Sequence, residues 1–392
     1  MRMTQLKTIA DIQTGPFGSQ LHKEDYVETG TPIVTVEHLG NRVFTEQNLP
    51  RVSDSDKARL IKYTLSTGDI VFSRVGSVDR CSYVDKSHDG WMFSGRCLRV
   101  RPTELVDSLY LYYYFCLEET KQFVRNIAVG ATMPSINTKL LGEVEIALPD
   151  LNNQKRIAAV LSSLDDKIEN NQKLNDNLYE MVNAYYASLF KDVECEMTTI
   201  GNYAERIYSG GTPTTSNATY WDGSFGWFSS GETRNRFVIS TEKTITQAGI
   251  DNSSTKLAAK HDIVMASAGQ GFTRGQTSML LLDTYVNQSV IVIHAERNIL
   301  PYLFWNLANR YEELRAISDS SSIRGSLTTK MIASFEIPLA NEESLQAFAN
   351  FSWSVIPQIE NNLLENERLA ALRDSLLPKL TSGELDVSDI QL

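Results

Sequence analysis

The chain has 392 residues, of which 42% are hydrophobic and 22% charged, and its formal net charge is −11. This length allows two domains that each bury a core, and the composition is normal for a globular protein. No apolar run approaches the ~18 residues of a membrane span, and the N-terminus lacks the apolar core of a signal peptide. We therefore expect a cytoplasmic protein.

Residues 1–150 predict a mixed α and β domain. Short β-type runs, separated by turn residues, occur at Pro32–Val36, Ile70–Ser73 and Leu98–Arg101. A helical stretch follows at Leu109–Val124. The order of the strands does not follow from the sequence.

Residues 151–192 predict a long helix, because residues 153–190 contain no glycine or proline and carry a heptad seam. A seam held for more than four heptads is typical of a coiled coil, and a helix of ~38 residues is roughly 55–60 Å long. The seam consists of Ile157, Leu161, Leu164, Ile168, Asn171, Asn175, Leu178, Val182, Tyr185 and Leu189.

Residues 193–340 predict a second mixed domain, with β-type runs at Ile263–Ala266 and Ser289–His294 and a helical stretch at Pro301–Ile317. Four aromatic residues cluster in this domain, and we expect them to pack in its core and not to stack on nucleic-acid bases. They are Trp221, Phe225, Trp227 and Phe228.

Residues 341–392 repeat the seam 191 positions later, less regularly. Arg373 falls on the seam, and we expect Leu372 to take its place. Pro357 lies inside the segment, which predicts a kink or two helices in sequence. The shifted seam positions are Phe348, Ser352, Val355, Ile359, Asn362, Asn366, Leu369, Arg373, Leu376 and Leu380.

The chain is therefore one unit written twice, with a period of about 191 residues. Glu145 matches Glu336, and Ile168–Asn171 matches Ile359–Asn362. The two copies match well at the end of each domain and in the helical segment that follows, which together form the frame of the repeat. Inside the domains the two copies match poorly, as expected for two domains that bind different ligands on one scaffold. An old duplication that simply drifted remains the alternative.

Each seam carries two asparagines, Asn171 and Asn175 in the first and Asn362 and Asn366 in the second. Asparagine at a seam position costs stability and can fix the register of a coiled coil. We predict an α+β protein in which two mixed domains are separated by two long helices. The helices pack as an antiparallel coiled coil with pseudo-two-fold symmetry. The alternative is that these amides merely face solvent.

The negative charge is unevenly distributed. Residues 341–392 carry 3 basic and 9 acidic side chains, whereas residues 1–150 carry 17 and 19, and residues 193–340 carry 12 and 14. The two mixed domains are thus nearly neutral, which predicts that any non-specific binding to a polyanion such as DNA would be weak and would need help from a more basic partner.

Motifs of catalysis and metal binding are missing from the sequence, which has no P-loop, GxGxxG, HExxH or GxSxG. The five histidines are scattered. Cys81, Cys97, Cys116 and Cys195 form no CxxC pair, and we expect buried, reduced thiols. We therefore expect a binding protein with no catalytic residue and no metal site.

Residues 146–190 and 372–385, together with the two-copy layout, resemble the central and distal repeats of type I restriction-modification specificity subunits. The resemblance covers essentially the whole chain as architecture and is specific in the helical repeats. The second copy departs from the first by having residues 339–343, Leu-Ala-Asn-Glu-Glu, in place of residues 148–152, Leu-Pro-Asp-Leu-Asn.

The resemblance implies target recognition domains at residues 1–150 and 193–340, each binding one half of a split, asymmetric site in double-stranded DNA. It implies conserved helical regions at residues 151–192 and 341–392, which set the spacer and dock two modification subunits. Those subunits would bind S-adenosylmethionine and methylate adenine, and restriction subunits using ATP and Mg would join them. The chain itself would bind no cofactor and catalyse nothing.

Base recognition needs Arg, Lys, Asn, Gln or Ser side chains on exposed loops. The loops 72–80 and 266–275 are the main candidates, because each follows an Asp-Ile-Val run and contains small residues. Ordinary surface loops are the alternative. The candidates are Ser19, Arg74, Ser77, Arg80, Ser135, Asn137, Lys139, Thr212, Arg234, Arg236, Ser267, Gln270, Arg274, Arg324, Ser326 and Lys330.

Two other functions remain open on the sequence. One is a coiled-coil scaffold or adaptor that binds two protein partners through its globular domains. The other is a fused enzyme with an unrecognised active site. Sequence-specific DNA retention separates the first from a specificity subunit, and methyl transfer by the chain alone separates the second.

Overall fold

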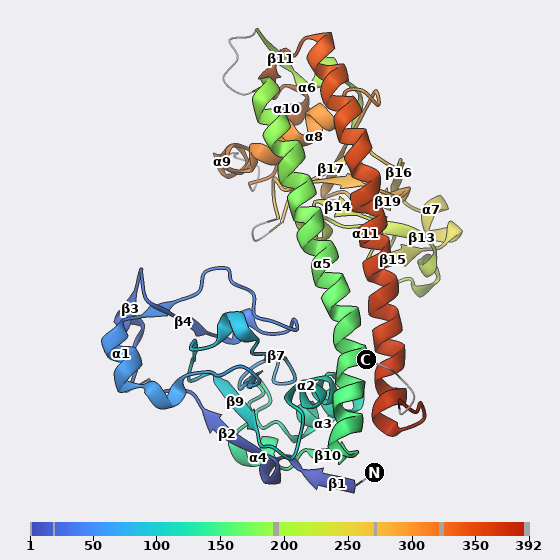
Figure 1. The fold of residues 1–392 in the computed structure, drawn as a ribbon. Helices are drawn as coiled ribbons and strands as arrows, with labels where there is room; N and C mark the ends of the chain where they lie inside the picture. Colours follow the sequence, from blue (N-terminus) through green and yellow to red (C-terminus); the bar gives the residue numbers. More distant parts are fainter. Residues whose placement is uncertain (1, 19, 191–195, 270–272, 321–324, 388–392) are drawn as a thin grey trace. The chain divides into compact units, whose positions relative to one another are not determined.

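The computed structural model describes residues 2–18, 20–190, 196–269, 273–320 and 325–387 (Figure 1). Contacts divide the chain into two units. Unit 1 comprises Met1–Glu169 and Arg368–Leu392, and unit 2 comprises Asn170–Glu367. Each unit therefore contains one globular part and portions of two long helices. The predicted α+β class, with two mixed domains and long helices, is confirmed.

The strands of unit 1 form two four-stranded sheets and a two-stranded ribbon. They are β1 Arg2–Gln5, β2 Ala10–Thr14, β3 Tyr26–Val27, β4 Thr31–Val34, β5 Arg51–Val52, β6 Ile70–Ser73, β7 Cys81–Tyr83, β8 Met92–Phe93, β9 Cys97–Pro102 and β10 Glu145–Leu148. The main sheet has the order β2-β9-β6-β7, the second has the order β3-β5-β4-β8, and β1 pairs with β10.

The helices of unit 1's globular part are short. They are α1 Asp54–Arg59, α2 Ser108–Cys116, α3 Glu118–Ile127 and α4 Thr138–Gly142, with 3-10 turns η1 Leu6–Thr8, η2 Lys23–Asp25, η3 Val36–His38, η4 Ile61–Tyr63 and η5 Lys86–His88. The single helix predicted over 109–124 is in fact two, because the backbone of Leu117 is extended between α2 and α3.

Unit 2 contains a five-stranded sheet, a four-stranded sheet and a ribbon. Its strands are β11 Met197–Thr199, β12 Ala204–Ser209, β13 Trp221–Phe228, β14 Phe237–Val238, β15 Lys243–Ile245, β16 Lys256–Ala258, β17 Ile263–Ala266, β18 Thr277–Leu280, β19 Thr284–Val286, β20 Val290–Ala295 and β21 Glu336–Pro338. The orders are β12-β20-β17-β18-β14, β15-β13-β19-β16 and β11-β21.

Unit 2's short helices are α6 Ile200–Tyr203, α7 Gln247–Asp251, α8 Leu300–Asn309, α9 Tyr311–Ser320 and α10 Thr329–Ala333, with 3-10 turns η6 Ala218–Tyr220 and η7 Ser230–Arg234. The helix predicted over 301–317 is again two, interrupted at Arg310, whose backbone leaves the helical region.

The duplication is confirmed by the topology. The antiparallel sheet β2-β9-β6-β7 has the same order as β12-β20-β17-β18, to which unit 2 adds β14 in parallel with β18. Toward the end of each copy, the spacing between matching elements is constant. The helices α4 and α10, the strands β10 and β21, and the two long helices each begin 191 residues apart.

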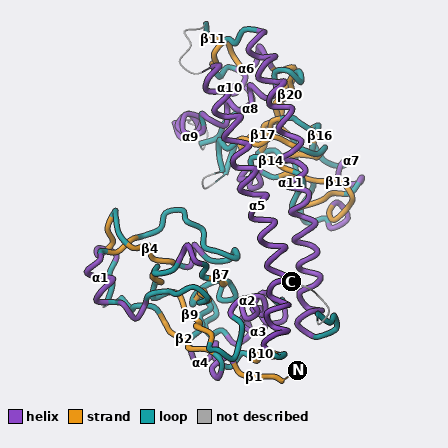
Figure 2. Tube along the Cα trace, in the orientation of Figure 1, coloured by secondary structure: helices purple, strands orange, loops and turns teal. Residues whose placement is uncertain are grey.

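The long helices are α5, Leu151–Phe190, and α11, Glu342–Ser382 (Figure 2). The departure at residues 339–343 does not shift the second helix start, because a polar side chain caps both helices. The Oδ1 atom of Asp150 accepts from Asn153 N at 3.0 Å, and that of Asn341 accepts from Ser344 N at 2.8 Å.

Within each unit the two helices pair antiparallel, as predicted. In unit 2, Asn171 meets Asn366, and the ring of Tyr185 meets that of Phe351 at 4.9 Å. In unit 1, Asp165 meets Arg373. As residue numbers increase along α5, the numbers of their partners on α11 decrease, so the two helices run antiparallel.

Two details of the second seam differ from the prediction. Helix α11 runs without interruption through Pro357, so the expectation of two helices is wrong. Pro357 is exposed and removes one helical hydrogen bond, while its neighbours Val355, Ile356 and Ile359 stay buried and hold the segment in the helix. Leu372 does not replace Arg373 either, since Leu372 is 46% exposed and Arg373 remains in the seam, paired with Asp165.

Each globular core continues into its portion of the helix pair. In unit 1, Phe72 and Phe115 of the domain belong to the same buried cluster as Leu161 and Leu380 of the helices. In unit 2, Trp305 stacks on Tyr179 of α5 at 5.7 Å and meets Phe348 of α11 at 5.8 Å. This shared core explains why each domain forms one compact unit with its helix portions. Within the described residues, none of the helices combines the length and apolarity that crossing a bilayer requires.

Candidate nucleic-acid interface

The two candidate segments of unit 1 meet each other. The loop after β6 and the segment before α4 are joined where Ile136 N donates to Arg74 O at 2.9 Å. A second bond runs from Gly76 N to Pro134 O at 2.8 Å. Candidate residues about 60 positions apart in sequence therefore share one surface region.

The matching segments of unit 2 meet in the same way. Leu327 N donates to Ser267 O at 2.8 Å, and Leu327 lies 191 residues after Ile136. Here a side chain strengthens the junction, because Arg274 Nη1 donates to Gly325 O at 2.6 Å. Both units thus present a paired-loop junction built on the same frame with different side chains.

The local sequence explains why the loops lie where they do. Asp69 and Asp262 close the turn before each central strand, accepting from Ser66 N at 2.8 Å and from Ala259 N at 2.9 Å. The strands that follow, β6 and β17, are buried throughout, so the chain emerges at a fixed edge of the sheet. Asp69 also forms an ion pair with Arg101, and its carboxylate raises the pKa of the Arg101 guanidinium.

Four candidates of unit 1 are exposed, and two are half-buried. Asn137 caps α4, with Oδ1 accepting from Leu140 N at 2.9 Å, and Arg80 donates to the carbonyl of Leu39. The exposed ones are Ser77, Arg80, Asn137 and Lys139, and the half-buried ones are Arg74 and Ser135. Ser19 lies outside the described residues.

Arg74 is fixed by contacts inside its own domain. Its Nη1 donates to Gly95 O at 3.0 Å, and its guanidinium lies 5.2 Å from the centre of the Phe17 ring. The side chain of Arg74 is therefore positioned before any ligand binds.

Three candidate arginines of unit 2 already pair with acids. Arg234 pairs with Glu242, and Arg274 with Asp319. Arg236 lies 3.4 Å from Asp176 of α5 and stacks over the ring of Tyr179 at 4.2 Å. These contacts hold loops and helix together, so a DNA contact by these arginines has to compete with them.

The other candidates of unit 2 differ in accessibility. Ser267 is only 6% exposed, Thr212 donates to Gln288, and Lys330 is exposed. Ser326 is half-buried. Gln270 and Arg324 lie outside the described residues.

The aromatic cluster of unit 2 divides into two kinds of residue. Trp227 and Phe228 are buried, which confirms core packing for them. Trp221 packs against Trp227 at 5.0 Å but stays half-buried, and Phe225 is 36% exposed. Only the inner half of the cluster therefore belongs to the core.

The four seam asparagines form hydrogen bonds between α5 and α11 in unit 2. Asn171 donates to Asn366 at 2.9 Å and to Glu365 at 2.7 Å. Asn362 donates to Asn175 at 2.8 Å. The amides thus lie between the helices.

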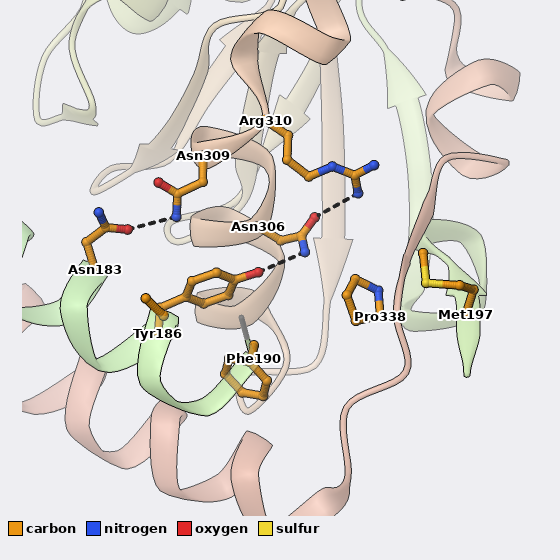
Figure 3. A pocket seen from close by; sticks show the side chains of 9 residues that line it. Asn183, Tyr186, Phe190, Met197, Asn306, Asn309, Arg310 and Pro338 are labelled. Carbon is orange, nitrogen blue, oxygen red and sulfur yellow. Dashed lines mark hydrogen bonds between the residues drawn. The ribbon is translucent and has the colours of Figure 1, made fainter. Parts of the chain in front are cut away.

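A cavity of about 540 Å³ lies in unit 2 where α5 meets α8 (Figure 3). Its polar groups are mostly paired: Asn306 donates to the hydroxyl of Tyr186 at 2.8 Å, and Asn309 donates to Asn183 at 2.7 Å. Burial raises the pKa of Tyr186 to about 12. The cavity contains none of the DNA-binding candidates, and its bonds join the domain to the helix.

Sequence reasoning missed the tip of a hairpin at residues 129–135. Val129 and Met133 are among the most exposed large apolar side chains of the described residues. The signal was present, because Gly130 and Pro134 bracket the tip and are typical turn residues.

Comparisons with known proteins agree on one class. Residues 1–180 and residues 193–366 each match the family model of the type I restriction modification DNA specificity domain. The specificity subunit of the type I restriction enzyme HindI of Haemophilus influenzae is 20% identical, over 83% of this chain and 88% of the relative. The MjaIX specificity subunit of Methanocaldococcus jannaschii is 24% identical, over 74% of this chain and 72% of the relative.

A solved structure shows the same fold. The S subunit of a type I restriction-modification system from M. genitalium covers 97% of this chain and 95% of its own, with a TM-score of 0.59 at 17% identity. The two matched segments define a protein with two copies of the DNA specificity domain. The chain belongs to the type I restriction modification DNA specificity domain family, which supports a role in DNA sequence recognition.

Proposed function

We propose that this chain recognises a bipartite, asymmetric DNA target, with one half-site bound by the globular part of each unit. The observation that carries the proposal is the pair of equivalent junctions, Arg74 with Ile136 and Ser267 with Leu327. A repeated frame holds both junctions at the same place, while their side chains differ. The same backbone arrangement in both units, with different side chains on its loops, suits two different half-sites on one duplex.

The two long helices have a separate part in the proposal. Their length sets the non-specific spacer between the half-sites, and their repeated surfaces dock two modification subunits. Two identical partners require two equivalent docking sites, and the strict 191-residue period of the helix starts supports this arrangement. Restriction subunits join the same complex.

The chemistry belongs to the partners in this proposal. The modification subunits bind S-adenosylmethionine and methylate adenine, and the restriction subunits use ATP and Mg. The chain supplies sequence specificity and catalyses no step itself. Its near-neutral recognition domains rely on the partners for part of the phosphate contact that non-specific affinity requires.

Methylome sequencing of cells with and without the chain tests this function. We expect one split motif, methylated in both halves, that disappears with the chain. Exchange of loop 74–80 for unrelated sequence should alter one half of the motif and leave the other half unchanged. A continuous motif, or no motif that depends on the chain, would contradict the proposal, as would methyl transfer by the chain alone.

A further inference from the structure

A short hairpin of unit 1, residues 129–135, exposes apolar side chains beside the paired-loop junction. Val129 and Met133 are each 62% exposed. Single exposed apolar residues are common on protein surfaces and need no explanation. Here the two lie on one hairpin, next to candidate DNA contacts, where a bound ligand would cover them.

The hairpin has a defined shape. Val129 N donates to Ser135 O, and Ser135 N donates to Val129 O, both at 2.9 Å. Gly130 has a φ of +111°, and a Cβ atom there would lie 2.7 Å from Met133 O, so only glycine fits the turn. The backbone therefore holds Met133 at a fixed place instead of leaving it on a loose loop.

The hairpin is also fixed to the loop that follows β6. Gly76 N donates to Pro134 O at 2.8 Å, and the bond between Ile136 and Arg74 follows at once. Arg74 in turn covers one side of Phe17, which is 53% exposed. Exposed apolar side chains and the cation of Arg74 thus lie on segments joined by backbone hydrogen bonds, an arrangement suited to a DNA-facing surface.

We propose that Met133, with Val129 of the same hairpin, recognises thymine in the half-site of unit 1 by contact with the C5-methyl group of the base. Thymine is the one base that presents a methyl group in the major groove, where cytosine presents an amino group. Apolar side chains bury that methyl group favourably. The inference rests on the proposed function and assigns one of its specificity-determining residues.

The two units differ at this point of the sequence. Arg324, which lies outside the described residues, stands 191 positions after Met133. Arginine is suited to the acceptor edge of guanine and methionine to a methyl group. The residue types at these two positions of the repeat therefore suit different bases.

The test uses the complex of the full chain with its modification subunits and a duplex carrying the target found by methylome sequencing. Each thymine is replaced singly by uracil, which lacks only the methyl group. For the wild-type complex we expect uracil at one or two positions of one half-site to weaken binding about fourfold, the equivalent of one unburied methylene. Met133→Ala should abolish that difference, and Met133→Leu should keep it.

Ile61→Ala is the matched control, because Ile61 is also 62% exposed but lies on η4, which belongs to neither of the paired loops. It should leave every uracil effect unchanged. An unchanged uracil penalty in Met133→Ala would overturn the inference. So would the absence of any thymine that responds, or a loss of modification subunits from the complex, which would place the hairpin on a protein partner. Failure of the wild-type complex to prefer its own site would instead contradict the proposed function.

Discussion

Asn171 donates a hydrogen bond of 2.9 Å to the side-chain oxygen of Asn366. Its counterpart 191 residues later, Asn362, donates one of 2.8 Å to Asn175, which is itself the counterpart of Asn366. The second bond is therefore the first with the two helices exchanged. Donor matches donor and acceptor matches acceptor, so the repeat in the sequence produces a local pseudo-two-fold arrangement between α5 and α11.

We predict that the acceptor asparagines contribute unequally to stability. Asn175→Ala leaves the amide of Asn362 without its acceptor and should lower the free energy of unfolding by about 1 kcal/mol. Asn366→Ala should cost less, because Asn171 keeps Glu365 at 2.7 Å. Urea unfolding measures both effects. Asn361→Ala, an exposed neighbour, is the control, and an equal loss there would show that the seam bonds contribute nothing specific.

A partly buried ion pair in unit 1 occupies the place of an apolar pair in unit 2. Asp165 accepts from Arg373 and from the hydroxyl of Tyr113, both at 2.6 Å. The residues 191 positions away from Asp165 and Arg373 are Ile356 and Val182, both buried. The two portions of the helix pair thus share one register, but an ion pair holds this position in unit 1 and two apolar side chains hold it in unit 2.

Removal of one partner of this pair should be costly. Arg373→Leu leaves the Asp165 carboxylate buried beside Tyr113 and should destabilise the chain by about 3 kcal/mol. Asp165→Ile combined with Arg373→Val copies unit 2 and should recover most of the loss. Denaturant midpoints of the three proteins decide the question, and a double variant as unstable as the single one would contradict it.

The seam shows what the sequence could and could not predict. The heptad pattern and the 191-residue period predicted both long helices, and the strands at 70–73 and 263–266 agree with β6 and β17. The long helices and these strands follow from patterns in the local sequence, which can be recognised without knowledge of the fold. Arg373 was misassigned because its acid, Asp165, lies 208 residues away, and no local pattern pairs them.

The candidate site shows the same limit. Sequence reasoning placed Arg74 and Arg274 on loops after buried strands, which is where they lie. It did not foresee that Arg274 binds Asp319, or that Arg236 stacks over Tyr179 on α5. Polar residues can bind a ligand or their own fold, and only the position of neighbouring acids and rings distinguishes the two.

His261 should make unit 2 sensitive to acid. Burial lowers its pKa, and the cations Lys260 and Arg297 lower it further. The unfolded chain, with a histidine pKa of about 6.5, then binds more protons than the folded chain. Stability is full above that pH and falls as the pH drops below it.

A single substitution tests this pH dependence. His261 has a φ of +79°, so asparagine, which tolerates this conformation, is the suitable replacement. We expect thermal unfolding of His261→Asn to lose less stability than the wild type between pH 7.5 and pH 5. Equal losses in the two proteins would show that His261 does not carry the effect. His22→Asn, on an exposed residue, is the control.

Lengthening the helix pair should lengthen the spacer between half-sites. The segment between Asn171 and Asn175 faces the segment between Asn362 and Asn366, so a heptad inserted into each keeps both seams in phase. Seven residues add roughly 10 Å of helix, which corresponds to about three base pairs. Methylome sequencing should then show the same two half-sites with a longer spacer. A heptad inserted into α5 alone is the control and should abolish methylation, because it breaks the pairing of the amides. Methylation at the original spacing by the doubly extended chain would show that the helices do not act as the ruler.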